Sequence, residues 1–194
     1  MVFDVERPAT MSRALVFLRV AILALLSWIG TSGSWPGLFY LGFPVVAAVL
    51  VAQKGGERYL AEDGERVTRW IGFAVGLIAY LALLTDKLPD GAQRNVRLEI
   101  ARSGSPSVGS CLVRILKAIP SAFVLFLYGV VGWFVWVIAA ISILVSERYP
   151  ASLWNFERGM VRWEARLIAY LASLVDSYPP YSFQTGTAAA ESSP

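Results

Sequence analysis

Long apolar runs and short charged links alternate along the chain. Residues 14–30 and 36–53 are two apolar runs joined by the uncharged link 31–35, and residues 118–145 are a third run without a charge. The first run carries one charge, Arg19, about one turn inside, from where it can snorkel to the membrane interface. Because roughly 20 apolar residues suffice for a helix to cross a bilayer, the first two runs predict one span each.

The third run is long enough either for one strongly tilted helix or for a hairpin. Tyr128 and Gly129 lie near its middle and Gly132 follows closely, and glycine readily adopts the backbone angles of a tight reversal. With residues 112–116 added in front, the hairpin has room for two helices. We therefore expect spans at about 112–129 and 131–145.

Two further apolar segments, 67–84 and 157–175, both contain the sequence LIAYLA. In the second segment Arg158, Arg162 and Arg166 recur every four residues, and apolar residues line the opposite face. This pattern is typical of an amphipathic helix that lies in the plane of the membrane interface. We expect the first segment to lie flat or to re-enter the membrane, as its charged counterpart must lie flat.

The two LIAYLA segments belong to a repeat with a spacing of 90 residues. Asp86 and Pro89 follow the first copy, and Asp176 and Pro179 follow the second. The repeat predicts an all-α integral membrane protein of two tandem units with parallel topology. Each unit is a transmembrane helical hairpin followed by a cytoplasmic interfacial amphipathic helix. The predicted parts are a first unit at 1–91, a second unit at 92–183, a short strand between the units at 95–101, and a disordered tail at 184–194.

Composition and charge agree with a membrane location. Apolar residues make up 56% of the chain and charged residues 16%, whereas soluble domains have about 45–50% and about 25%. The 17 Lys and Arg residues all fall in four places, namely the amino-terminal segment through Arg19 and residues 54–69, 87–117 and 148–166, and a flat segment 67–84 places all four on one side. Since short loops rich in Lys and Arg stay in the cytoplasm, we expect both termini to be cytoplasmic.

The residue types exclude several kinds of chemistry. The chain has no histidine and a single cysteine, Cys111, so we expect no Cys/His metal site, no histidine-based acid–base catalysis and no disulfide within the chain. Neither a catalytic residue nor a cofactor nor a nucleic-acid partner is expected. The sequence therefore favours a protein that is not an enzyme.

The acidic residues that follow the LIAYLA segments allow two interpretations. Asp86 and Asp176 resemble the membrane-embedded carboxylates of proton relays. Both also stand at a helix end before a proline, where polar groups satisfy free backbone carbonyls. We favour the helix-end role.

The segment 176–183 and the arginine stripe are the other candidate contact sites. The segment, with Tyr178, Pro179, Pro180 and Tyr181, is either a polyproline-type recognition segment or a rigid stop whose aromatics anchor the interface. We favour the anchor. The stripe of Arg158, Arg162 and Arg166 is a candidate contact for anionic lipid headgroups or partner proteins, or it serves only as generic topology charge.

Several stretches resemble a family of bacterial and archaeal membrane proteins known only as a domain of unknown function. These stretches are NVRLEIARSG, RILKAIPSAFVLF, SERYPASLWNFERGMVRW and RLIAYLASLVDSYPPYSF, in that order. The resemblance covers 93–183 well and 13–90 loosely, and Ser121 stands where members often carry histidine. It implies a multi-pass protein of the prokaryotic cytoplasmic (inner) membrane with no established activity.

Three functions fit these observations. We expect a non-catalytic accessory or scaffold subunit of a larger membrane assembly, in contact with anionic lipids and with other membrane subunits. A small transporter or channel formed by homo-oligomerisation is the alternative, although the spans contain few polar residues. A membrane enzyme acting on lipid is the least favoured, because it would need an aspartate or lysine base.

Overall fold

The chain is mostly helical, and the computed structural model describes residues 1–30, 35–89 and 96–179. A small two-stranded sheet accompanies the helices. The elements are β1 (Val2–Val5), α1 (Arg13–Gly30), α2 (Trp35–Lys54), α3 (Gly56–Arg58), the π-helical turn η1 (Tyr59–Asp63), α4 (Gly64–Leu81), β2 (Val96–Glu99), α5 (Val108–Ser146) and α6 (Ala151–Leu171). The predicted tail 184–194 lies outside the described residues.

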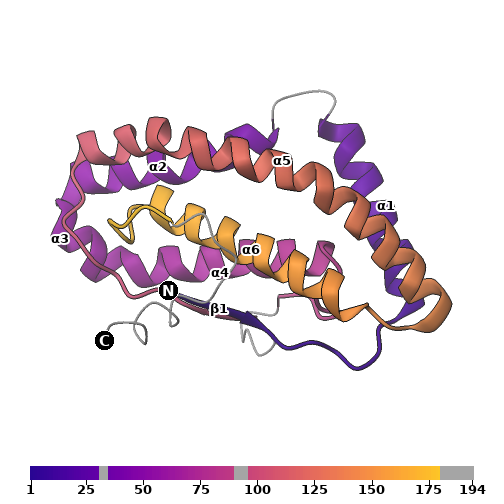
Figure 1. The fold of residues 1–194 in the computed structure, drawn as a ribbon. Helices are drawn as coiled ribbons and strands as arrows, with labels where there is room; N and C mark the ends of the chain where they lie inside the picture. Colours follow the sequence, from indigo (N-terminus) through magenta and orange to yellow (C-terminus); the bar gives the residue numbers. More distant parts are fainter. Residues whose placement is uncertain (31–34, 90–95, 180–194) are drawn as a thin grey trace, which may run out of the picture.

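The elements form layers (Figure 1). The apolar helices α1, α2 and α5 lie along one side, α4 and α6 lie side by side beneath them, and β1 lies on the far side of α6. Helix α6 touches α2, α4, α5 and β1, and is the most deeply buried element. The core therefore sits around α6, and the apolar helices cover only one of its sides.

Helix α5 is continuous, and the predicted hairpin is wrong. It runs unbroken for 39 residues through Tyr128 and Gly132. A glycine inside a helix costs about 1 kcal/mol, which is too little to break a helix that is otherwise apolar. Gly132 serves close packing instead, because a Cβ there would lie 3.0 Å from the Cε of Met160 in α6. A capping box between Ser107 and Ser110 starts the helix.

Helix α6 begins at Ala151, six residues before the predicted start, and protein covers both of its faces. Its apolar stripe packs inward, with Trp163 and Leu167 only 1% and 2% exposed. Its basic face lies against β1, and Arg162 is 5% exposed. The amphipathic pattern was recognised correctly, but the strand that covers the polar face was not predicted.

Helix α4 follows η1 directly, so one nearly continuous helical path leads from Gly56 to Leu81. One face of α4 is buried, with Ile71, Val75 and Ala79 fully enclosed. The opposite face exposes Trp70 and Phe73. Segment 67–84 therefore has the two faces that an interfacial helix needs, and its position relative to a bilayer stays a prediction.

The strand expected at 95–101 is present as β2. It pairs with β1 in antiparallel register, with Val2 opposite Glu99 and Val5 opposite Val96. Alternation places Phe3 and Val5 in the core, at 1% and 2% exposure. Strand β1 was not predicted, and its partner β2 lies more than 90 residues further along the chain.

Candidate functional site

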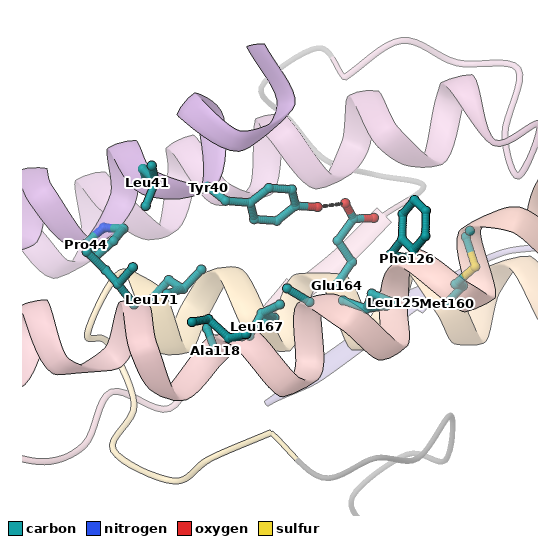
Figure 2. Close-up of a pocket in the computed structure, with 14 residues that line it drawn as sticks. Tyr40, Leu41, Pro44, Ala118, Leu125, Phe126, Met160, Glu164, Leu167 and Leu171 are labelled. Carbon is teal, nitrogen blue, oxygen red and sulfur yellow. Dashed lines mark hydrogen bonds between the residues drawn. The ribbon is translucent and has the colours of Figure 1, made fainter. Parts of the chain in front are cut away.

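A groove between α2, α5 and α6 holds a hydrogen-bonded pair of polar side chains. The hydroxyl of Tyr40, on α2, donates to the carboxylate of Glu164, on α6 (Figure 2). The groove has a volume of about 510 Å³. Its other lining residues are apolar: Leu41, Pro44, Ile115, Ala118, Ile119, Ala122, Leu125, Phe126, Gly129, Met160, Leu167 and Leu171.

Glu164 is the acidic residue of this groove. Its side chain is partly accessible from the groove, yet the surrounding protein desolvates the carboxyl group and raises its pKa, an effect that the hydrogen bond from Tyr40 opposes. Among the described residues, no ion pair joins Glu164 to a lysine or arginine. The second carboxylate oxygen points towards Phe126 rather than Tyr40 (Figure 2).

A second apolar cavity, of about 840 Å³, lies between α2 and α4. Tyr40 and Glu164 line both cavities, so their hydrogen bond stands where the two meet. Trp70 and Phe73, exposed on α4, line the second cavity. Both volumes fall in the range of about 300–1,000 Å³ that is typical of ligand pockets.

Two arginine clusters fix the segments that follow α4 and α6. In the first, Arg19 of α1 donates to the carbonyl of Thr85 at 2.6 Å and pairs with Asp86 at 3.0 Å. Its guanidinium lies 4.2 Å from the ring centroid of Tyr80. Arg19 is fully buried, so the expectation that it snorkels to the interface is wrong.

In the second cluster, Arg114 of α5 plays the corresponding part. It donates to the carbonyls of Tyr170 (2.9 Å) and Val175, and pairs with Asp176. Its guanidinium lies 4.7 Å from the ring centroid of Tyr170. Tyr170 and Asp176 follow Tyr80 and Asp86 by 90 residues, whereas Arg114 follows Arg19 by 95. Sequence analysis missed both arginines as partners, although each is a charge placed among apolar residues near a helix start.

The other predicted motif residues have structural partners in the protein. Pro89 packs against α4 at Gly76, where a Cβ would lie 3.0 Å from the proline Cβ. The hydroxyl of Tyr178 lies 2.6 Å from the Oγ of Ser121 in α5, and Pro179 is buried. Pro180 and Tyr181 lie outside the described residues. The aromatic anchor for 176–183 stays a prediction.

The predicted arginine stripe faces β1. Arg158 pairs with Asp4 at 3.2 Å, and its guanidinium lies 4.8 Å from the ring of Trp154. Arg162 donates to the carbonyl of Phe3 at 3.1 Å, and Arg166 is 8% exposed. Contact with lipid headgroups stays a prediction, and little of Arg162 or Arg166 is accessible for it.

A second carboxyl group, that of Glu157, is buried on α6, at the residue before Arg158. Glu157 is 3% exposed, and burial, with the nearby charge of Glu164, raises its pKa to about 7. Its Oε1 and the hydroxyl of buried Tyr149 have no hydrogen-bond partner among the described residues. In the described part of the chain, no cluster of three His, Cys, Asp or Glu side chains could hold a metal ion.

These features define a helical protein with an apolar layer over an amphipathic one. Of the helices in the described ranges, α5 alone is long and apolar enough to cross a membrane. A family model, a domain of unknown function (DUF4389), matches residues 109–182, which span α5, α6 and the segment with Asp176. The resemblance to a family of unknown function is thereby supported for this part of the chain. No curated protein and no solved structure matches.

Proposed function

We propose that the protein is a non-catalytic integral membrane protein that acts as an accessory or scaffold subunit of a larger membrane assembly. The observation that carries this proposal is the uncovered apolar surface of α5. Leu116 and Phe126 are each 67% exposed and Val145 is 74% exposed. Apolar patches of this kind mark contacts with lipid or with other proteins. Helices α1 and α2 add the exposed side chains of Phe17, Leu25, Leu41, Val45, Val46 and Val49.

In this proposal the layer of α1, α2 and α5 lies in the bilayer, and α4, α6 and the sheet stay at its cytoplasmic face. Helix α5 is about 58 Å long at 1.5 Å per residue, against about 30 Å of hydrocarbon. Its start is tied to the aqueous layer through Arg114 and Asp176, and its end through Glu147, whose carbonyl accepts a bond from Met11. In this arrangement both ends of α5 lie at the cytoplasmic face of the membrane. The two termini of the chain are also in the cytoplasm.

Two tandem units with parallel topology account for the matching helix ends. The backbones of Leu83 and Ser173 both adopt the left-handed conformation, with φ of 62° and 57°. The amide that follows each donates five residues back, Leu84 to Ala79 and Leu174 to Ala169. The duplication that we propose makes α1 and α2 together the counterpart of α5. The inner membrane of a prokaryote is the proposed location.

Among the described residues the two cavities offer no polar path, which favours a scaffold over a transporter. Apart from Tyr40 and Glu164, every lining residue of the two cavities is apolar. The buried carboxylates Glu157 and Glu164 are the observation that keeps a homo-oligomeric transporter as the second candidate, because buried acids can carry protons or cations.

Extraction from the native membrane in a mild detergent tests the proposal. A scaffold subunit elutes as a particle of fixed composition that contains other subunits in constant ratio. A lone monomer or a symmetric homo-oligomer would contradict the scaffold and favour the transporter. Flotation with phosphatidylcholine vesicles tests the membrane location separately. Val131→Lys, on the exposed face of α5, should weaken flotation, while the matched change Glu99→Lys, on β2, should not.

A further inference from the structure

We propose that the groove between α2, α5 and α6 binds a long-chain amine, with its hydrocarbon chain along the groove and its ammonium group on Glu164. This inference rests on the proposed membrane location, because the chain enters from the bilayer. It goes beyond that proposal in assigning a ligand class and a contact residue.

The shape and lining of the groove suit a single hydrocarbon chain. Its walls are apolar side chains from three helices, and Figure 2 shows labelled lining residues on both sides of Tyr40 and Glu164. Ile119 and Phe126 line the groove and are also 58% and 67% exposed. The groove is therefore continuous with the apolar surface that faces lipid, which gives a chain a way in without passing through water.

The carboxyl group inside the groove selects the head group. Glu164 has one oxygen on the hydroxyl of Tyr40, and the other points towards Phe126 (Figure 2). A carboxylate in an apolar environment stays ionised only beside a partner of opposite charge, and the described residues supply none for Glu164. An ammonium group carries that charge and donates hydrogen bonds to the open oxygen.

The neighbours of the open oxygen also suit a cation. The ring of Phe126 and the thioether of Met160 lie on that side of the carboxylate (Figure 2). The face of an aromatic ring attracts ammonium groups, and a thioether is polarizable. An anionic or phosphate head group would instead meet the carboxylate with like charge. The groove therefore fits a cationic amphiphile better than the acyl chain of an ordinary phospholipid.

The test measures binding of tetradecylammonium to the full-length protein in nonionic detergent, relative to protein-free micelles. Tetradecanol is the neutral probe of equal chain length, and propylammonium is the cation without a chain. We expect tetradecylammonium to bind at least about tenfold more tightly than either, which corresponds to about 1.4 kcal/mol. Equal binding of the amine and the alcohol would overturn the inference, as would equal binding of the short amine.

Three variants locate the site. Glu164→Gln keeps the shape and should weaken amine binding about tenfold while leaving tetradecanol unchanged. Ala122→Trp narrows the groove at an exposed position and should weaken both probes. Glu65→Gln, an exposed acid on α4, is the matched control and should change neither. Unchanged amine binding in Glu164→Gln overturns the inference.

Vesicle flotation of the same preparation separates the two proposals. Protein that floats with vesicles but binds both long-chain probes equally would contradict the amine site and leave the membrane location intact. Protein that fails to float would contradict the membrane location itself.

Discussion

Arg19 and Asp86 form an ion pair at 3.0 Å between the first apolar helix and the segment that follows α4, with the guanidinium fully buried. Arg114 and Asp176 form the corresponding pair after α6. Each aspartate thus holds a buried arginine that also satisfies carbonyls beyond the helix end. The helix-end role of the two aspartates stays a prediction, and in both places the aspartate lies beside an arginine that donates to these carbonyls.

Loss of a buried arginine should destabilise the fold far more than loss of an exposed one. Arg114→Met leaves the carbonyls of Tyr170 and Val175 without a donor, so we expect a loss of about 2–3 kcal/mol. The midpoint of thermal unfolding in detergent should fall by about 5–10 °C. Arg97→Met is the control, because its pair with Glu99 is largely exposed and contributes at most about 1 kcal/mol. Equal effects of the two changes would contradict this role for Arg114.

Replacing Gly104, before α5, or Gly109, within α5, by alanine should change the stability of the protein in opposite directions. Gly104 has φ of +95°, and a Cβ there would clash with the carboxylate of Asp176. Gly104→Ala should therefore destabilise the protein by about 1–3 kcal/mol. A Cβ on Gly109, in the first turn of α5, meets nothing within 4 Å, so Gly109→Ala should stabilise by about 0.5–1 kcal/mol. Thermal unfolding of the two variants measures both, and shifts of the same sign would be inconsistent with this geometry.

Two tyrosines 90 residues apart should differ in what their hydroxyls contribute. The hydroxyl of Tyr59 donates to the carbonyl of Ala172 at 2.5 Å, across the two proposed units. Tyr59→Phe should cost about 1 kcal/mol. The buried hydroxyl of Tyr149 has no hydrogen-bond partner in the described ranges, so Tyr149→Phe should be neutral or stabilising. A larger loss in Tyr149→Phe than in Tyr59→Phe, by denaturant or thermal unfolding, would refute this assignment.

Stability should fall as pH rises from about 4.5 to about 7. The pKa of Glu157 is raised from 4.5 to about 7, mainly by burial, so the folded protein holds this proton more tightly than the unfolded chain. The contribution to stability is complete below pH 4.5 and is lost as pH rises through the folded pKa, with a total of about 3 kcal/mol.

Replacing Glu157 by glutamine should remove most of this pH dependence of stability. Glu157→Gln should flatten the change of the unfolding midpoint with pH and raise the midpoint at pH 8. Glu164, whose pKa is raised by the same cause, accounts for a remaining slope that adding Glu164→Gln should remove. The exposed control Glu65→Gln should keep the wild-type profile. A wild-type profile in Glu157→Gln would show that this carboxyl does not titrate as described.

The sequence predicted the helical segments and the strand β2 because apolar runs and alternation are local signals. It did not predict that α5 is continuous, because a glycine such as Gly132 gives the same local signal whether it allows a turn or the close packing of Met160. The pairs between Arg19 and Asp86 and between Tyr40 and Glu164 join residues 67 and 124 positions apart. Periodicity tells which face of a helix is apolar, but not which distant side chain meets it. Strand β1 was missed because its pairing partner lies more than 90 residues away in the sequence, and the cover over the arginines of α6 was missed with it.

The most direct test of the membrane arrangement uses single cysteines along α5 in a Cys111→Ser background. Ser105→Cys and Ser146→Cys lie at exposed positions before and at the end of the helix, and Val131→Cys lies on its exposed apolar face. In intact cells we predict that a membrane-impermeant maleimide labels neither end, and that after permeabilisation it labels both ends quickly and Val131→Cys slowly. Labelling of one end alone in intact cells, or fast labelling of Val131→Cys, would contradict a bilayer-embedded α5 with both ends in the cytoplasm.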